Sequence, residues 1–459
     1  MKKTVNILFV AVCIGLCLSL FICMSFAKTD STTENKRLSQ LPKLYDKELN
    51  IDFLSEMGEY FGDHFAFRNN LVDMDSRIQS GIFGVSNMDT VIKGSDGWLY
   101  YTDSLDDYLR KNTLSKRSVK SIARNLSIVQ EYVRSRGAEF VFTIAPNKNS
   151  LYDDNMPYYH SKKSGSKKNI DRLNPELKDI NYCDLFTLFG SQDEILYHKR
   201  DSHWNNKGAM LVFSEIMKKL GKPCTDYSEV NAVKKKDFIG DLGRMLYPVS
   251  AEPEWNYYYD YKQYTSDFDS VEAPYIHTKS DSGEGTLLMF RDSFGNSLLP
   301  FFSGEFDTAA FSKGIPYALE EYMDELNPEY VVIEKVERNL DELCGEPPVM
   351  TGTPAGLNTE IKTVKSSSKL SVSPSEANSA YIEIKGEADR RFVTDDTVFY
   401  IKLSSGQSYE ALNAFSVTSD KSDCGFLLYI PAERVADGAE VELIADNGKE
   451  QLSLINKTV

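Results

Sequence analysis

Short, uninterrupted apolar runs that alternate with helical patterns dominate the middle of the chain. Runs without alternating polar positions are typical of parallel strands that are buried on both faces of a sheet. The pattern at residues 116–136 predicts a helix that ends at Gly137, a residue at which helices commonly stop. Strands that alternate with helices predict an α/β domain over residues 91–345, with a mainly parallel sheet flanked by helices. The runs occupy residues 139–145, 287–290 and 330–334.

The first 27 residues differ from everything that follows. Lys2 and Lys3 precede an apolar run over residues 5–27, which is long enough to span a bilayer, and the lysines favour a cytoplasmic amino terminus. Small residues at the end of the run also offer a signal-peptidase site. Residues 1–27 are therefore predicted to be a signal anchor or a cleaved signal peptide. Either form places residues 28–459 outside the cytoplasm.

Two further regions flank the α/β domain. Residues 28–90 begin with a polar stretch and continue with apolar positions at helical spacing, which predicts a membrane-proximal tether and helices. After Cys344, a linker at 347–357 is rich in Pro, Gly and Thr and precedes short alternating strands. Residues 346–459 are thus predicted to be a linker and a small β-sandwich, with carbohydrate binding or spacing as its role.

The composition argues against a nucleic-acid partner and is compatible with glycan binding. The chain of 459 residues has a formal charge of −16, so nucleic acid is not an expected partner. Its 26 tyrosines suit a sugar-binding surface, and many lie in an irregular stretch at 222–285, where a loop of this length is typical of function. The four cysteines beyond the first segment form no metal-binding pattern, and their disulfide pairing cannot be read from the sequence.

The run at 287–290 ends in a polar corner that could carry chemistry. Arg291, Asp292 and Ser293 follow the predicted strand at once, and an apolar helical pattern begins at Phe294. A serine at this position has its hydroxyl at the rim of the sheet and its N–H free to face a developing oxyanion. The alternative is that Asp292 or Ser293 only caps the helix.

A second stretch supplies the partners that a nucleophilic serine needs. Asp201 and His203 are two residues apart, and in extended backbone such side chains face the same side. The carboxylate could accept a hydrogen bond from one ring nitrogen and direct the other nitrogen toward Ser293. Asn147 and Lys148 follow the strand at 139–145, and open α/β sheets bind ligands at such carboxyl ends of strands.

These motifs together resemble a known family. The segment Asp201-Ser202-His203-Trp204, followed by a strand-borne Asp-Ser-Phe, is similar to the DHHW and alginate acetylation (AlgX/AlgJ-like) group of SGNH-hydrolase-like proteins. The resemblance spans about residues 35–340 and implies an SGNH fold and an extracytoplasmic O-acetyltransferase or esterase that acts on polysaccharide. Further matches in the expected order are Asn35-Lys36-Arg37-Leu38, residues 61–68, Gly97-Trp98-Leu99-Tyr100, Pro146-Asn147-Lys148 and Gly240-Asp241-Leu242.

By position, the resemblance implies that Ser293 is the nucleophile, His203 the base and Asp201 the residue that orients it. Arg291 departs from the pattern, because many SGNH proteins have glycine there, which affects the expected turn geometry. The Asp/His pair precedes the serine, which matches this subgroup. Candidates for oxyanion or substrate binding are the Ser293 N–H and the side chains of Asn147, Lys148, Trp204 and Arg291.

The predicted reaction is acetyl transfer through an acetyl-serine to a hydroxyl of a cell-surface or secreted polysaccharide. With water as the acceptor, the same site would be an acetylesterase. The family implies that a membrane acyltransferase partner supplies acetyl groups; no cofactor or metal is expected. Two other readings stay open: a zinc site built from His198, Asp201 and His203, and a surface protein that binds glycan without catalysis.

Overall fold

The structure is a computed structural model that describes residues 2–24, 26, 38–165, 167–358, 360–418, 422–435 and 438–458. The segment Asn35-Lys36-Arg37 and most of the predicted polar tether lie outside the described residues. Helix α1 spans Lys2–Cys23. Among the described residues, no helix combines the length and the apolar character that a membrane crossing requires. The signal anchor or signal peptide stays a prediction.

The central sheet has seven strands in the order β4-β3-β11-β9-β10-β8-β7. Strands β4, β3, β11, β9 and β10 run parallel, whereas β8 pairs antiparallel with β10 and β7 antiparallel with β8. The predicted α/β fold class is confirmed, and the edge formed by β8 and β7 makes the sheet mixed. The strands span Glu139–Ala145 (β3), Tyr182–Cys183 (β4), Thr265–Ser266 (β7), Tyr275–Lys279 (β8), Thr286–Phe290 (β9), Thr308–Ser312 (β10) and Tyr330–Val336 (β11).

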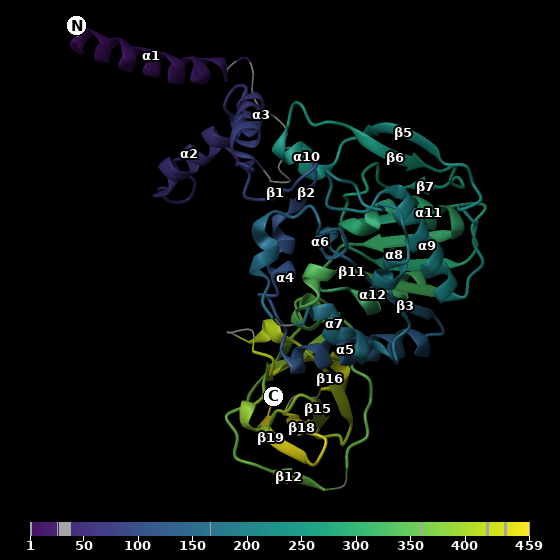
Figure 1. Cartoon of the computed structure of the whole chain (residues 1–459). Helices are drawn as coiled ribbons and strands as arrows, with labels where there is room; N and C mark the ends of the chain where they lie inside the picture. The colour runs from purple at the N-terminus through teal and green to yellow at the C-terminus, as the bar shows by residue number, and fades with distance from the viewer. Residues whose placement is uncertain are drawn as a thin grey trace.

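Helices cover both faces of this sheet (Figure 1). Leu287 and Met289 of β9 pack into one hydrophobic core, whereas Leu288 and Phe290 pack into the core on the opposite face. Burial on both faces is why this strand reads as an unbroken apolar run. One face is covered by α8 (Leu185–Gly190), α9 (Asn206–Leu220) and α11 (Leu299–Glu305), and the other by α5 (Lys116–Ser135), α12 (Leu319–Leu326) and α13 (Glu342–Gly345).

Smaller elements complete the part of the chain before the carboxyl-terminal β region. The predicted hairpin forms as β1 (Val91–Lys93) paired with β2 (Leu99–Tyr101). The stretch 222–285 is more regular than the sequence predicts, because it contains an antiparallel ribbon, a helix and strands β8 and β7 at one side of the sheet. These and the remaining helices are β5 (Val233–Phe238), β6 (Glu254–Tyr258), α10 (Asp241–Leu246), α2 (Phe53–His64), α3 (Arg68–Ile78), η1 (Gln79–Phe83), α4 (Leu105–Tyr108), α6 (Lys148–Leu151) and α7 (Asn169–Leu173).

The carboxyl-terminal strands form a curled β-sheet, which confirms the predicted β region. All eight strands belong to one hydrogen-bonded sheet in the order β12-β19-β18-β15-β16-β17-β14-β13, and the sheet curls around its own apolar core. The predicted boundary at residues 345 and 346 stays a prediction. The strands span Ile361–Thr363 (β12), Lys369–Pro374 (β13), Tyr381–Glu387 (β14), Val398–Leu403 (β15), Ser408–Asn413 (β16), Gly425–Pro431 (β17), Glu440–Asp446 (β18) and Gln451–Thr458 (β19).

Helix α5 fastens this β region to the α/β region. The buried guanidinium of Arg117 donates to the carbonyl oxygens of Thr397 at 2.9 Å and Asp423 at 2.6 Å. Arg124 donates from Nε and Nη2 to the two carboxylate oxygens of Glu410, at 2.6 and 2.5 Å. Bidentate pairs of this kind fix orientation as well as contact. The β region therefore docks on the helix that packs under β3, away from the N-terminal helices (Figure 1).

Candidate active site

The polar corner after β9 holds Ser293 at the rim of the sheet. Asp292 caps the 3₁₀ helix Ser293–Ser297, because its Oδ1 accepts from the Phe294 N–H at 2.8 Å. Its Oδ2 accepts from the Val336 N–H at 2.6 Å, and its own N–H donates to Glu334 Oε2 at 3.0 Å. The capping interpretation and a functional serine are thus compatible, since the cap residue fixes the backbone on which Ser293 stands.

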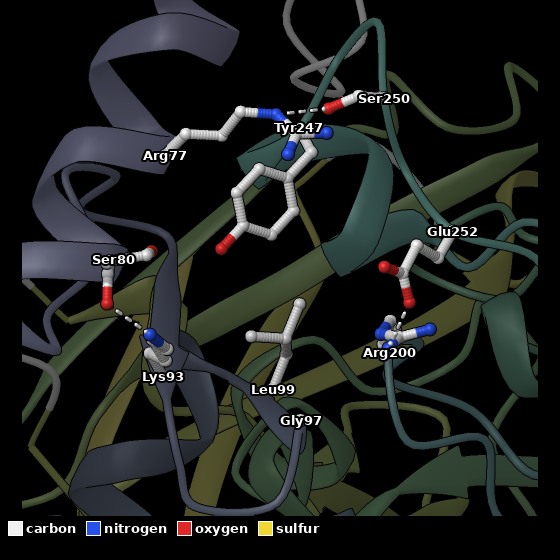
Figure 2. Close-up of a pocket in the computed structure, with 10 residues that line it drawn as sticks. Arg77, Ser80, Lys93, Gly97, Leu99, Arg200, Tyr247, Ser250 and Glu252 are labelled. Atoms are coloured by element: carbon white, nitrogen blue, oxygen red, sulfur yellow. Dashed lines mark hydrogen bonds and ion pairs between the residues drawn. The ribbon is translucent and has the colours of Figure 1, made fainter.

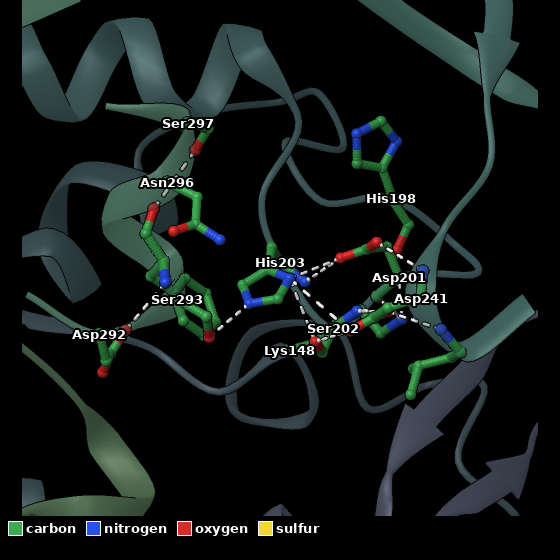
Figure 3. Close-up of polar contacts among 12 residues, drawn as sticks. Lys148, His198, Asp201, Ser202, His203, Asp241, Asp292, Ser293, Asn296 and Ser297 are labelled. Carbon is green, nitrogen blue, oxygen red and sulfur yellow. Dashed lines mark hydrogen bonds and ion pairs between the residues drawn. The ribbon is translucent and has the colours of Figure 1, made fainter. Parts of the chain in front are cut away.

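Ser293, His203 and Asp201 form a continuous chain of hydrogen bonds (Figure 3). Ser293 Oγ lies 2.8 Å from His203 Nε2, and His203 Nδ1 lies 2.7 Å from Asp201 Oδ1. Asp201 Oδ1 also accepts from the His203 backbone N–H at 2.9 Å. The structure therefore brings together the three residues that the sequence singles out, with the separations that a nucleophile, a base and an orienting carboxylate require.

The start of helix α9 fixes the loop that carries the Asp/His pair. Asn205 is the N-cap, and its side-chain oxygen accepts from the N–H groups of Lys207 and Gly208, both at 3.0 Å. Asn205 also donates its own N–H to the Leu196 carbonyl at 2.8 Å, which closes the loop on itself. His203 is thus two residues from a capped helix start, and its backbone has little freedom to move.

Asp241 is a third acidic residue at this site, and the sequence interpretation did not assign it a role. Its N–H donates to Asp201 Oδ2 at 2.7 Å. Its carboxylate accepts from the Ser202 N–H at 2.8 Å and from the Ser202 hydroxyl at 2.5 Å. Gly240 permits this approach, because a Cβ there would lie 2.3 Å from the Arg200 carbonyl oxygen. The Gly-Asp-Leu motif was the signal that could have identified Asp241.

The charges of the three ionisable groups depend on one another. Burial would raise the pKa of Asp201, but the facing His203 and the N–H of Asp241 hold that pKa well below its usual range. Burial lowers the pKa of His203, but the Asp201 charge and hydrogen bond outweigh it and leave the pKa above its ordinary value. Burial and the charge of Asp201 raise the pKa of Asp241 to about 6. Asp201 therefore stays ionised and stabilises a protonated His203.

Asn147 and Lys148 follow β3 as predicted, but both side chains are engaged away from Ser293. The Asn147 amide donates to Asp107 Oδ2 at 3.1 Å, and its oxygen accepts from Arg338 at 3.2 Å. The buried Lys148 ammonium donates to the carbonyl oxygens of His198, Lys199 and Asp201, at 3.2, 3.0 and 2.6 Å. Neither residue lines the cavity at Ser293. Lys148 instead braces the backbone of the loop that carries Asp201.

Trp204 and Arg291 lie close to Ser293 and support its surroundings. The Trp204 indole donates to Ser297 Oγ at 2.6 Å, and its ring packs edge-on against Phe294 with centroids 4.8 Å apart. Arg291 is buried, donates to the Val271 carbonyl at 2.8 Å and contacts the Asn296 side-chain oxygen. Both residues connect the serine turn to neighbouring elements, and Trp204 also borders the cavity.

A cavity of about 420 Å³ opens over the three residues. Its volume is typical of ligand pockets. The Ser293 N–H makes no hydrogen bond to any residue that the structure describes. It is therefore available to an incoming oxyanion. The other lining residues are mostly aromatic or amide side chains, namely Phe238, Tyr258, Tyr261, Trp204, Asn206, Asn256 and Asn296.

The predicted zinc ligands are only partly brought together. Asp201, His203 and Asp241 present donor atoms that all lie within 4.8 Å of one another. His198 is not in this group, because its ring stacks on Phe238 with centroids 4.0 Å apart. Burial lowers the pKa of His198 to about 4, so its imidazole is neutral at neutral pH. The carboxylates and His203 are already satisfied by one another through hydrogen bonds.

Part of the chain matches a known family. Residues 91–281 match the family model described as an SGNH hydrolase-like domain of the acetyltransferase AlgX. The matched range contains Asp201, His203 and Asp241 and ends before Ser293. No curated protein matches the chain.

Several solved structures are similar to this chain at low identity. PatB1 from Bacillus cereus is 16% identical with a TM-score of 0.44, over 55% of this chain and 96% of PatB1. A DHHW family protein from Eubacterium siraeum is 15% identical with a TM-score of 0.39, over 50% of this chain and 90% of that one. AlgX from Pseudomonas aeruginosa is 14% identical with a TM-score of 0.35, over 79% of this chain and 96% of AlgX. These superpositions are too loose to carry an argument about the site. The match covers residues 91–281, less than half of the chain, and over that range it confirms the predicted resemblance to the SGNH hydrolase-like domain of the acetyltransferase AlgX.

Proposed function

We propose that this protein is an extracytoplasmic O-acetyltransferase that acetylates a polysaccharide through an acetyl-serine at Ser293. The observation that carries the proposal is the hydrogen-bonded series from Ser293 through His203 to Asp201 at the floor of a cavity. The family match supports acetyl transfer as the reaction class. The predicted location outside the cytoplasm comes from residues 1–27.

In the first half of the reaction, Ser293 Oγ attacks the carbonyl carbon of an acetyl ester. His203 Nε2 takes the hydroxyl proton as the new C–O bond forms, and ionised Asp201 stabilises the resulting imidazolium. The Ser293 N–H then donates to the negative oxygen of the tetrahedral intermediate. The intermediate collapses when the donor alkoxide leaves and receives the proton from His203. The product is acetyl-Ser293 and the deacetylated donor.

In the second half, a sugar hydroxyl gives its proton to His203 and attacks the acetyl-serine carbonyl. Collapse returns the proton to Ser293 Oγ and leaves the acetyl group on the sugar. Water in place of the sugar would release acetate, which is the esterase alternative. The aromatic side chains Phe238, Tyr258 and Tyr261 at the cavity favour a sugar acceptor, since their faces pack against the C–H groups of a sugar ring.

The acetyl donor defines the partner that the proposal requires. Acetyl groups activated inside the cell would have to cross the membrane before they reach a site outside it. We therefore propose that a membrane acyltransferase partner supplies the acetyl group to Ser293. The polysaccharide hydroxyl is the second substrate, and the described site needs no cofactor for either half of the reaction.

Replacement of Ser293 tests the proposal directly. In Ser293→Ala, acetyl transfer from a small aryl acetate to an oligosaccharide should fall by at least about 10³-fold, because the acyl intermediate can no longer form. The control is Ser228→Ala, an exposed serine outside the cavity, which should keep full activity. Transfer that persists in Ser293→Ala would overturn the mechanism.

The same assay distinguishes an enzyme from a protein that only binds glycan. A chain that only binds glycan would turn over no acetyl ester, and its glycan affinity would be unchanged in a Ser293→Ala, His203→Ala double variant. Release of acetate without transfer to any sugar would instead support the esterase reading. The ratio of transferred to hydrolysed acetyl groups decides between the two enzymatic outcomes.

A further inference from the structure

A second cavity, of about 320 Å³, shares the loop that carries the Asp/His pair. It opens between α3 with η1, the β1–β2 hairpin and the chain that follows α10 (Figure 2). Arg200 lines this second cavity, whereas its neighbour Asp201 lines the catalytic one. One backbone segment therefore contributes to two separate cavities, and the volume of the second is also in the range of ligand sites.

The second cavity is basic although the chain as a whole is acidic. Arg77, Lys93 and Arg200 line it, and Glu252 is the single carboxylate among its described lining residues. Asp73, which does not line the cavity, accepts from Arg77 Nε at 3.0 Å. Three cations thus face one carboxylate among the lining residues, against a chain charge of −16. Such a local excess attracts an anion.

Most hydrogen-bond donors of these cations have no partner among the residues that the structure describes. The Lys93 ammonium donates to the Ser80 carbonyl oxygen at 2.7 Å, which leaves two of its protons without an acceptor. Arg200 uses Nη2 for Glu252 at 2.7 Å, and that carboxylate is 73% exposed. Within the described residues, Lys93 and the Arg200 guanidinium make no further hydrogen bond. The cavity therefore offers charged donors and lacks the acceptors to match them.

The remaining wall of the cavity is apolar and aromatic. Leu99 is buried there, and the Arg77 guanidinium carbon lies 6.0 Å from the centroid of the Tyr247 ring. Figure 2 shows the Tyr247 side chain reaching across the cavity, with its hydroxyl on the side of Ser80 and Lys93. That hydroxyl has no hydrogen-bond partner in the described part of the chain. A ring face and a leucine beside cations suit a sugar that carries an anionic substituent.

We propose that this cavity binds an anionic unit of an acidic saccharide. Its carboxylate or phosphate accepts hydrogen bonds from Lys93, Arg77 and Arg200, and its ring packs on Tyr247 and Leu99. The preference for an anion rests on the cavity alone. The saccharide rests on the proposed function, since a chain that acetylates a polysaccharide needs a place to hold a unit remote from the reacting one.

Titration calorimetry of the full chain with tetragalacturonate, at constant ionic strength, tests the proposal. Arg77→Gln and Lys93→Gln should each weaken binding by about tenfold, the loss of one hydrogen bond to a charged group. The matched control is Lys178→Gln, which removes the same charge from a side chain that is 77% exposed elsewhere, and it should bind as the wild type does. Neutral cellotetraose should bind far more weakly than tetragalacturonate.

Turnover of a small aryl acetate reports on folding and on Ser293 independently of this cavity. It should be the same in the wild type and in all three variants, because none of the substituted residues lines the catalytic cavity. Equal tetragalacturonate affinity in the wild type, Arg77→Gln and Lys93→Gln would overturn the proposal. Binding of inorganic phosphate alone, without binding of tetragalacturonate, would overturn the saccharide part. Absence of ester turnover with intact anion binding would overturn the proposed function, whereas the proposed anion site would still be supported.

Discussion

The two cavities that flank residues 200 and 201 use their charges in opposite ways. In the cavity at Ser293, Asp201 and Asp241 receive hydrogen bonds from one histidine, one serine and the backbone, so both carboxylates have donors at short range. In the basic cavity, Arg200 and Lys93 keep donors that nothing in the described chain accepts. A carboxylate held beside His203 suits proton transfer, because it stabilises the protonated imidazole. Charged donors without acceptors suit the retention of an anionic ligand.

The substitution with the largest expected effect should change one cavity and leave the other unchanged. Asp201→Asn should lower the kcat for acetyl-ester turnover by about 10³- to 10⁴-fold, because His203 loses the carboxylate that fixes its tautomer and stabilises its protonated form. Tetragalacturonate affinity should stay within about twofold of the wild type, since the substituted side chain does not line the basic cavity. Asp193→Asn, at an exposed aspartate, is the control. A parallel loss of both properties would show that the two cavities are one functional unit.

Substitution of Lys148, which supports the backbone of residues 198–201, should affect both cavities. Lys148→Met removes the ammonium that binds three carbonyl oxygens around residues 198–201. We expect the free energy of unfolding to fall by about 3 kcal/mol, because buried carbonyl groups lose their donor. Ester turnover should fall by about a hundredfold, as expected for a displaced catalytic group. Both anion affinity and denaturant unfolding should be measured, and an effect on catalysis alone would argue against a shared support.

A smaller effect is expected from the acidic residue behind the triad. Asp241→Asn should lower kcat/KM by about tenfold, the loss of one charged hydrogen-bond acceptor for Ser202. The negative charge of Asp241 also helps to raise the pKa of His203. Since His203 acts as a base only when neutral, activity is lost as the pH falls through the His203 pKa. Removal of the Asp241 charge lowers that pKa, so the acid limb of the pH–rate profile should move to lower pH.

The pH profile distinguishes an electrostatic role of Asp241 from a purely structural one. A fall in rate without any movement of the acid limb would mean that Asp241 only shapes the loop. Movement of the acid limb to higher pH would contradict the sign of the interaction. Asp193→Asn should leave both the rate and the position of the acid limb unchanged. Asp193 is exposed and, among the described contacts of His203, is not one of its partners.

Local patterns in the sequence drew attention to the three residues that the structure brings together, Ser293, His203 and Asp201. Strands β3, β9 and β11 read as unbroken apolar runs because helices cover both faces of the sheet. Ser293 stood out because it follows such a run at once. The spacing of Asp201 and His203 indicated their shared orientation, which the 2.7 Å contact between their side chains realises. Each of these patterns involves only neighbours in the sequence, whereas the pairing of His203 with Ser293 was predicted from the family resemblance.

Features that depend on distant segments were not predictable in this way. The ribbon of β5 and β6 was missed because Lys234, Lys235 and Lys236 face solvent and leave no alternating apolar signal. The contact of Asp241 with Asp201 depends on α10 approaching a loop about 40 residues earlier. Lys148 was placed correctly at the end of β3, but the carbonyl oxygens that bind its ammonium come from another part of the chain.

Trapping the acyl-enzyme tests the central claim most directly. The full chain is mixed with excess aryl acetate, quenched in acid within the first turnover, digested and analysed by mass spectrometry. Our account predicts one added acetyl group on the peptide that contains Ser293, and no such adduct in Ser293→Ala. It also predicts that an oligosaccharide added before the quench removes the acetyl group from that peptide. An acetyl group on a different residue, or rapid turnover with Ser293 never acetylated, would contradict the account.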